Sequence, residues 1–166
     1  MKSSSDLPLA GVRVLELSQI MAGPTCGLML SDMGAEVIKI EKFPGGDDAR
    51  GYAKPGDPGL APGFLMLNRG KRSVAVDIRK PAGGEIIERI AARSDVVTEN
   101  FRRGKLDALG LGYEALRKIN PQLVYCSISG YGPTGPMADK GGFDLVLQAF
   151  SGLISVTGSR PDNLVK

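Results

Sequence analysis

With 166 residues, of which 42% are hydrophobic and 23% charged, the chain has the size and composition of a soluble globular domain, which excludes a disordered chain. Its net charge of +3 comes from 21 basic and 18 acidic residues that are interspersed, so we expect no nucleic-acid partner. No apolar run reaches the roughly 18 residues that a membrane span requires, and we expect a cytoplasmic protein with no membrane partner. The chain contains no histidine, which excludes Ser-His-Asp and Cys-His nucleophile systems and the usual zinc sites within it, and we expect no metal.

The first forty residues predict a strand, a helix and a second strand. Residues 12–18 (VRVLELS) are β-branched and Leu-rich, which is typical of a strand. The next apolar residues follow helical spacing, with Pro24 in the first turn and Gly34 at the C-terminal cap. Residues 36–42 (EVIKIEK) predict the second strand.

The same alternation continues toward the C-terminus. Because strands that alternate with helices are joined by right-handed crossovers, the pattern predicts an α/β, Rossmann-like fold with a largely parallel sheet and helices on both faces. The predicted strands are residues 73–78, 95–101 and 123–131, and the predicted helices are residues 81–94 and 113–120.

Two segments rich in glycine and proline interrupt this alternation. Residues 43–73 form a connection of about thirty residues, and its length predicts a binding loop or a disordered insert. Residues 129–144 (SGYGPTGPMADKGGFD) could grip a phosphate or acyl group, or could simply connect two core elements. Asp144 is predicted to be the N-cap or a first-turn residue of the helix that follows. Cys26 and Cys126, a hundred residues apart in apolar surroundings, are predicted to be buried free thiols.

Open parallel sheets bind ligands beyond the carboxyl ends of their strands, so the segments after the strands are the first candidates for a site. The chain has neither G-x-G-x-x-G after a strand nor a Walker-type GK[ST] before a helix, which disfavours NAD and ATP binding by those routes. Basic residues recur in these segments and in the long loop, and as a group they suit a ligand with phosphates, whereas each one alone could be solvated surface. They are Lys42, Arg69, Lys71, Arg72, Arg79, Lys80, Arg102, Arg103 and Lys105.

Taken together, several segments resemble the N-terminal part of the family III CoA transferases, the CaiB/BaiF group. The resemblance covers almost all of the chain from Leu9 to Thr157. The segments are LAGVRVLELSQIMAGPTCGLMLSDMGAEVIKIEK, LNRGKRSVAVDIRKPAG, SDVVTENFRRGKLDALGLGYEALRKINPQLVYCSISGYGPTGP and FDLVLQAFSGLISVTG.

The resemblance implies a Rossmann-like large domain that binds coenzyme A, a smaller second domain, and a homodimer of two interlocked chains. It implies that an aspartate attacks an acyl-CoA thioester, that CoA then forms an aspartyl thioester, and that a carboxylic acid acceptor leaves as the new acyl-CoA. Residues 1–8 would be a disordered N-terminal tail, and residues 9–166 an incomplete CoA-binding large domain. The nucleophilic aspartate would follow residues 158–166, so that Asp162 is not that residue and the chain alone would hold no catalytic residue.

The resemblance also implies a set of CoA contacts. Lys42 and Arg79 would supply cations for the phosphates, while Val76 and Phe101 would supply apolar surface for the adenine. Gln19 and Met21 stand where formyl-CoA transferase has His and Gln, so the oxalate-handling pattern of that enzyme is not reproduced. The implied contacts are Gln19, Ala22, Lys42, Val76, Arg79, Asn100 and Phe101.

Two alternatives to the transferase hypothesis remain. Racemases of this superfamily carry a catalytic histidine in a Gly-His-Asp motif, where this chain has Phe143, and a phenyl ring cannot exchange a proton. Racemase or lyase activity is therefore disfavoured. The other alternative is a CoA-binding module without catalytic activity.

Overall fold

The structure is a computed structural model that describes residues 6–52, 61–160 and 165. The chain forms two compact units, residues 1–128 and residues 129–166. Part of the expected N-terminal tail, residues 1–5, lies outside the described residues, whereas Leu7 and Ala10 belong to a turn closed by a backbone hydrogen bond of 3.0 Å. Within the described part of the chain, no helix is both long and apolar enough to cross a membrane.

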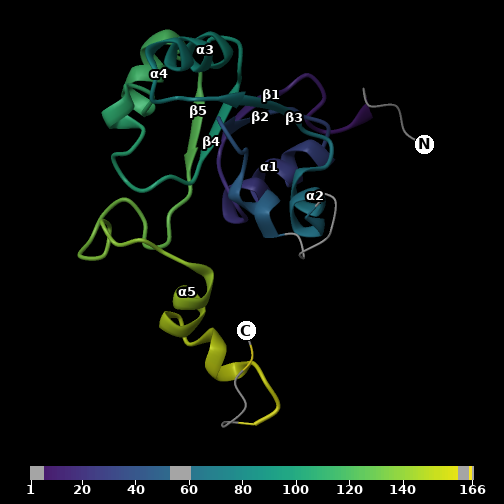
Figure 1. Cartoon of the computed structure of the whole chain (residues 1–166), viewed down its shortest axis with the longest axis vertical. Helices are drawn as coiled ribbons and strands as arrows, with labels where there is room; N and C mark the ends of the chain where they lie inside the picture. The colour runs from purple at the N-terminus through teal and green to yellow at the C-terminus, as the bar shows by residue number, and fades with distance from the viewer. Residues whose placement is uncertain (1–5, 53–60, 161–164, 166) are drawn as a thin grey trace. The chain divides into compact units, whose positions relative to one another are not determined.

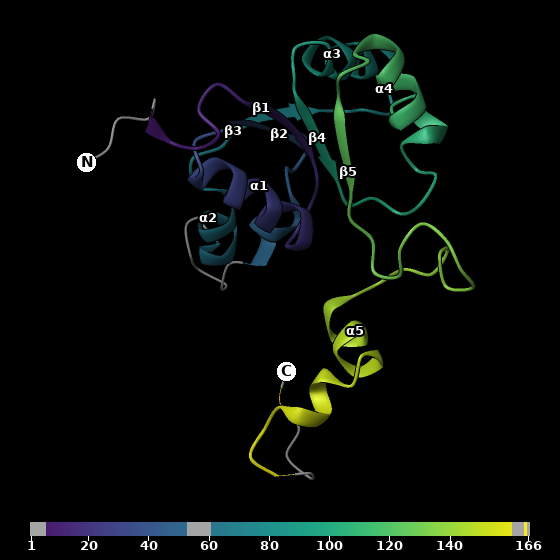
Figure 2. The same ribbon diagram turned by 180° about the vertical axis from the view of Figure 1, so that it is seen from behind.

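The first unit is built on a five-stranded sheet in which every neighbouring pair is parallel, in the order β3-β2-β1-β4-β5. Helices α1 and α2 cover one face of this sheet, and α3 and α4 cover the other (Figures 1 and 2). The predicted Rossmann-like α/β fold is thereby confirmed. The strands are β1 (Arg13–Leu17), β2 (Glu36–Lys42), β3 (Arg72–Val76), β4 (Val96–Glu99) and β5 (Val124–Ser127), and the helices are α1 (Ala22–Asp32), α2 (Pro62–Asn68), α3 (Pro81–Ala91) and α4 (Tyr113–Ile119).

Strand β1 lies at the centre of the sheet and buries both of its faces. Leu15 and Leu17 join the main apolar core, which includes Ile87 of α3 and Leu116 of α4. The alternate residues point toward α1, because successive side chains of a strand face opposite sides of the sheet. On that side Glu16 is completely buried, although it is charged.

The long connection between β2 and β3 contains more regular structure than the sequence predicted. It holds a 3₁₀ helix, η2 (Asp48–Tyr52), and helix α2, while residues 53–60 lie outside the described residues. Pro62 occupies the first turn of α2, where its missing N–H costs nothing, and Phe64 is buried beside Ala49 and Ala61. Of the two alternatives predicted for this connection, a disordered insert is wrong for residues 48–52 and 62–68, which form helices.

The two cysteines come together across α1 and β5. Both are free, and both are half-buried rather than fully buried as predicted. Burial, and then the neighbouring thiol of Cys126, raise the pKa of Cys26. Helix α1 ends as predicted, since Gly34 follows its last turn with a φ of 102°, a left-handed conformation that favours glycine.

The second unit contains helix α5 (Asp144–Phe150) and a 3₁₀ helix, η4 (Leu153–Val156). Its glycine-rich segment folds back on itself, because a Cβ on Gly130 would lie 2.8 Å from the Cα of Gly142. Asp144 is the first residue of α5, as predicted, and its carboxylate accepts a hydrogen bond of 2.8 Å from Gln148. Phe143 precedes the helix and is 65% exposed.

Candidate functional site: a pocket at the carboxyl ends of the strands

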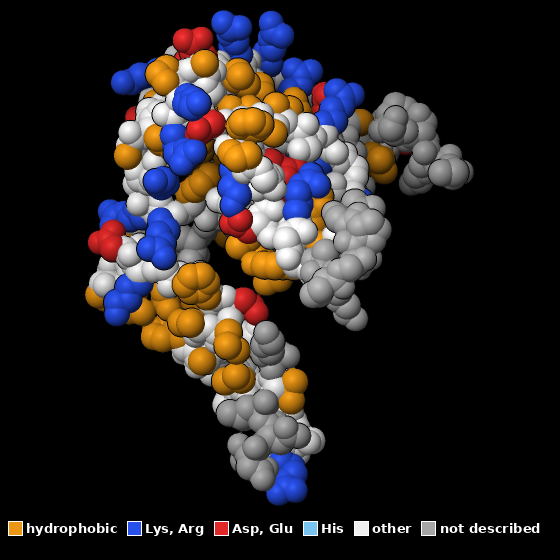
Figure 3. Space-filling view, in the orientation of Figure 1, with side chains coloured by type: hydrophobic (Ala, Val, Ile, Leu, Met, Phe, Trp, Pro, Cys, Tyr) orange, Lys and Arg blue, Asp and Glu red, His pale blue; other side chains and the backbone are white. Residues whose placement is uncertain are grey.

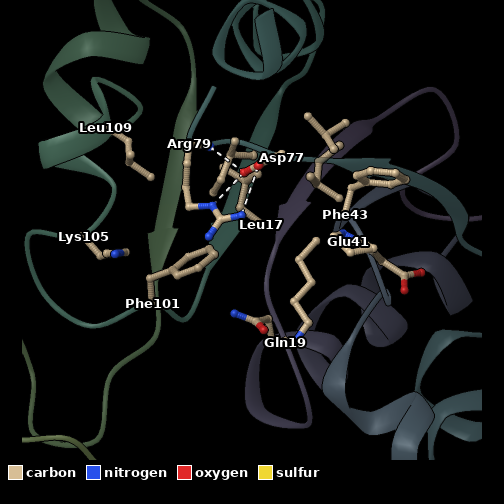
Figure 4. A pocket seen from close by; sticks show the side chains of 14 residues that line it. Leu17, Gln19, Glu41, Phe43, Asp77, Arg79, Phe101, Lys105 and Leu109 are labelled. Carbon is tan, nitrogen blue, oxygen red and sulfur yellow. Dashed lines mark hydrogen bonds and ion pairs between the residues drawn. The ribbon is translucent and has the colours of Figure 1, made fainter. Parts of the chain in front are cut away.

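A pocket of about 280 Å³ opens at the carboxyl ends of β1, β2 and β3, within the first unit (Figure 4). The segments that follow β1, β2, β3 and β4 all contribute to its walls, as expected for an open parallel sheet. It is lined by Leu17, Gln19, Ile40, Glu41, Lys42, Phe43, Pro44, Val76, Asp77, Ile78, Arg79, Phe101, Lys105 and Leu109.

The floor of the pocket is apolar and belongs to the core. Leu17, Ile40 and Val76 are the last apolar residues of their strands, and each is at most 6% exposed. Phe101 and Leu109 pack against the same core. Phe43 is 61% exposed at the other side of the pocket, so two aromatic rings flank the opening in Figure 4. Such a surface suits a flat, largely apolar ring system.

Asp77 and Arg79 form a fork at the end of β3. Nε of Arg79 lies 2.8 Å from Oδ1 of Asp77, and Nη2 lies 3.0 Å from Oδ2. The hydrogen bonds from Arg79 hold the pKa of Asp77 below its ordinary value. Helix α3 approaches this turn closely, because a Cβ on Gly83 would overlap the carbonyl of Asp77. The Arg79 side chain is 69% exposed, which leaves room for an anion on its outer edge.

Two lysines complete the basic side of the pocket. Lys42, at the end of β2, forms an ion pair with Asp48, and both side chains are about half exposed. Lys105 lies between β4 and the short helix η3 (Asp107–Leu109), and it forms no ion pair with any residue that the structure describes. Lys105 is therefore the pocket cation most available to an anionic ligand.

Glu41 also lines the pocket, but its carboxylate is fully engaged. Nε and Nη2 of Arg50 each lie 2.7 Å from it, and Oγ of Ser73 lies 2.6 Å away. Burial raises the pKa of Glu41, but the hydrogen bonds from Arg50, Ser73 and the Asp47 N–H outweigh burial and lower the pKa to about 2. Since Asp77 is also paired, neither carboxylate of the pocket is placed to act as a nucleophile.

Most of the residues predicted to contact coenzyme A meet in this pocket, namely Gln19, Lys42, Val76, Arg79 and Phe101. The other two do not line it. Ala22 is the exposed first residue of α1, and the side chain of Asn100 binds the backbone of Gln19, with hydrogen bonds of 2.9 Å to its N–H and to its carbonyl. Whether any of the seven contacts CoA stays a prediction.

The predicted basic rim is smaller than expected. Arg69 pairs with Asp32, and Arg72 pairs with Glu36 at the amino end of the sheet. Lys71 is buried beside Glu16. Burial lowers the pKa of Lys71, and this effect outweighs the opposing effect of the Glu16 carboxylate. Lys80, Arg102 and Arg103 are exposed and do not line the pocket.

The sequence analysis did not select Phe43, Asp77 or Leu109 as site residues. The aspartate stands two residues before Arg79 in a turn, a spacing at which the two side chains can pair. Phe43 and Leu109 carried no signal, because a single apolar residue outside the predicted strands and helices does not reveal which part of a pocket it lines.

A parallel sheet with helices on both faces and an apolar, partly basic pocket at its carboxyl ends defines the class of open α/β proteins, in which ligand sites lie at that edge of the sheet. The sequence pattern described as CoA-transferase family III matches residues 9–165. The chain therefore belongs to CoA-transferase family III.

Individual relatives agree with this assignment. The chain is 48% identical over 161 residues to a succinate–glutarate CoA-transferase of Agrobacterium fabrum, covering 93% of this chain and 40% of the relative. It is 47% identical over 156 residues to the succinyl-CoA:glutarate CoA-transferase of Homo sapiens, covering 94% and 35%. Among solved structures, a CAIB/BAIF family protein from Brucella suis is similar with a TM-score of 0.89 and 46% identity, covering 96% of this chain and 43% of that one. The chain thus spans well under half the length of these relatives.

Proposed function

We propose that this chain is the CoA-binding part of an acyl-CoA:carboxylate CoA transferase. The observation that carries the proposal is the pocket, in which the apolar side chains of Val76 and Phe101 lie close to the cations Lys42, Arg79 and Lys105. Coenzyme A combines a flat adenine with phosphates, and it needs both kinds of surface. Family membership supports the same ligand.

The proposed reaction runs through a covalent aspartyl intermediate. An aspartate attacks the acyl-CoA carbonyl and expels CoA thiolate, which leaves a mixed anhydride. The thiolate attacks the aspartyl carbonyl, forms an aspartyl-CoA thioester and releases the first acid. The acceptor carboxylate repeats the exchange in reverse, so that a new acyl-CoA leaves and the aspartate is regenerated.

The nucleophile of this proposed reaction is not a pocket carboxylate. Glu41 and Asp77 are both held in ion pairs, and displacing either from its arginine would leave that charge without its partner. We therefore propose that the aspartate comes from outside the residues that the structure describes. The first unit would then bind and orient CoA without providing the attacking group.

The acids are proposed from the relatives. Two of them are named for succinate or succinyl-CoA together with glutarate, which favours a dicarboxylate donor and acceptor. Another, from Chloroflexus aurantiacus, is named for succinyl-CoA and D-citramalate. We propose that the donor is succinyl-CoA and that the acceptor is a C4 to C5 dicarboxylic acid.

A transfer assay tests this proposal. The complete protein encoded by the gene would be incubated with succinyl-CoA and, separately, with glutarate, citramalate, malate or oxalate. Chromatography should show one new acyl-CoA appearing in step with the loss of succinyl-CoA, and Phe101→Ala should lower the rate while Lys118→Ala on α4 should not. Mass spectrometry without an acceptor should find CoA attached to the protein. No exchange with any acid would contradict the proposal.

We also propose that the protein acts as a homodimer with interlocked chains, located in the cytoplasm. The apolar surface of the second unit supports the dimer, because α5 and η4 bury none of their residues (Figure 3). Exposed apolar residues of this unit include Leu145, Val146, Phe150, Leu153 and Val156. Light scattering on the complete protein should give twice the chain mass, and the dimer should persist on dilution.

A further inference from the structure

Ile20 has a backbone conformation that its side chain disfavours. Its φ is 65°, and it is the one non-glycine residue with positive φ in the part of the chain that the structure describes. A β-branched side chain is disfavoured in the left-handed region, because its Cβ crowds the backbone. The residue stands between Gln19, which lines the pocket, and the start of α1. Something in the fold must therefore hold this turn in place.

Asp47 is the group that holds it. The Ile20 N–H donates to the carboxylate of Asp47, with 3.0 Å to Oδ1 and 3.2 Å to Oδ2. Oδ1 also accepts a hydrogen bond of 2.9 Å from the N–H of Ala49. The Asp47 side chain is 1% exposed and does not line the pocket, and in the segment after β1 its carboxylate accepts a hydrogen bond from Ile20. The Asp47 N–H separately donates to the pocket residue Glu41, a contact that Asp47→Ala leaves in place.

Asp47 is itself fixed by a buried group of charges. Nζ of Lys39 lies 2.9 Å from Oδ2 of Asp47, 3.0 Å from Oε1 of Glu16 and 2.8 Å from the carbonyl of Ser18. Nζ of Lys71 lies 2.8 Å from Oε2 of Glu16, which balances two cations with two carboxylates. All four side chains are at most 1% exposed. A buried network whose charges are all paired is rigid, so Asp47 has little freedom to move.

Gln19, the residue before Ile20, is held by a residue that follows β4, the other neighbour of β1 in the sheet. The side chain of Asn100, at the end of β4, binds both the N–H and the carbonyl of Gln19. The N–H groups of Gln19 and Ile20 therefore both bind side chains that follow other strands. This arrangement ties the segment after β1 to the segments after β2 and β4, where the pocket opens.

We propose that Asp47 is a positioning residue, held by Lys39, that keeps Ile20 left-handed and thereby presents Gln19 to the CoA pocket. The inference rests on the proposed function of that pocket. Without the Asp47 carboxylate, Ile20 would adopt a negative φ in most molecules. Only a minor fraction of the protein would then keep the turn in the conformation that binds CoA. Apparent affinity falls in proportion to that population.

The test is a rescue experiment in the complete protein, with CoA as the probe. Asp47→Ala should weaken CoA binding about 5- to 30-fold, the factor expected when an L-residue is no longer held in the left-handed region. Ile20→Gly should be nearly silent alone. Combined with Asp47→Ala, it should restore affinity to within about threefold, because glycine adopts positive φ without steric cost.

A matched control separates positioning from general stability. Asp95 accepts a 2.8 Å hydrogen bond from the N–H of Arg13 at the opposite, amino end of the sheet. Asp95→Ala should lower the unfolding midpoint without changing CoA affinity, and adding Ile20→Gly to Asp95→Ala should not raise that midpoint.

A second variant is available if Asp47→Ala does not fold. Asp47→Ala combined with Lys39→Met removes both partners of the ion pair together and leaves Glu16 paired with Lys71. Adding Ile20→Gly to this double variant gives the same rescue test.

Two results overturn the proposal: unchanged CoA affinity in Asp47→Ala, or weakened affinity that Ile20→Gly does not restore. Amide hydrogen exchange separates this failure from failure of the proposed function. If the wild-type protein does not bind CoA, the proposed function is refuted. The exchange of the Ile20 amide then still decides whether Asp47 holds the turn, since it should accelerate in Asp47→Ala and not in Asp95→Ala.

Discussion

A single methyl group added at Gly27 should disrupt the buried charges beneath α1. A Cβ on this residue would overlap Oε2 of Glu16, and it would lie 2.9 Å from Cδ of Glu16 and 3.2 Å from Nζ of Lys71. Glu16 is completely buried in a central strand, so its carboxylate cannot move aside without leaving the two lysines. Gly27→Ala therefore separates ion pairs that have no access to water.

Two opposing effects set the magnitude. Alanine is favoured over glycine inside a helix by about 1 kcal/mol. Breaking a buried ion pair by displacing one partner costs about 3–5 kcal/mol. The free energy of unfolding should therefore fall by about 2–4 kcal/mol, although helix propensity alone predicts an increase.

Urea unfolding followed by circular dichroism measures this difference, and α3 provides the control. A Cβ on Gly84 would meet no atom within 4 Å, so Gly84→Ala should raise the free energy of unfolding by up to about 1 kcal/mol. Both variants should keep the slope of the wild-type transition. If Gly27→Ala is as stable as Gly84→Ala, Glu16 is not held where the structure has it.

Three further predictions concern the pocket and the sheet. Hydrogen bonds from Arg50 and other donors outweigh burial and lower the pKa of Glu41 from its ordinary 4.5 to about 2. The ionised carboxylate should therefore add up to about 3 kcal/mol to the free energy of unfolding above pH 4.5, and this contribution should be lost as the pH falls toward 2. Glu41→Gln should remove this pH-dependent part of the unfolding free energy, as measured by urea unfolding at several pH values. The hydroxyl of Thr98 is buried without a hydrogen-bond partner among the described residues, so Thr98→Val should leave stability unchanged or raise it by about 1 kcal/mol; a clear loss in thermal unfolding would contradict this. Lys105→Ala should weaken CoA binding about 3- to 10-fold and reduce its salt dependence in calorimetry, whereas Lys118→Ala should change neither.

The fold could be predicted from the sequence because local patterns and general topology rules agree. The strand in residues 36–42 was predicted with the bounds that the structure gives to β2, and the other predicted strands differ by a few residues at their ends. Alternation of strands with helices then leaves few topologies, and the right-handed crossover selects a parallel sheet. The pocket followed from the rule that such sheets bind ligands at their carboxyl ends.

Roles that depend on tertiary contacts could not be predicted in this way. Lys71 was grouped with the basic rim, but it lies under α1 because Glu16 needs a second cation. Nothing in the sequence indicated that the Asn100 amide binds the backbone of Gln19, while its predicted contact with CoA stays a prediction. One signal was present, since Glu16 and Lys39 are opposite charges that each stand between two apolar residues of a strand. Charges at such positions indicate a buried pair when the strands are neighbours.

The most direct test of the account is a calorimetric titration of coenzyme A into the complete protein, in parallel with the variant Phe101→Ala. We expect one CoA to bind per chain in the wild type. The variant should bind at least about tenfold more weakly, because it loses an aromatic wall that packs on the core around the pocket. Absence of binding in the wild type, or equal affinity in the variant, would contradict the assignment of this pocket to CoA.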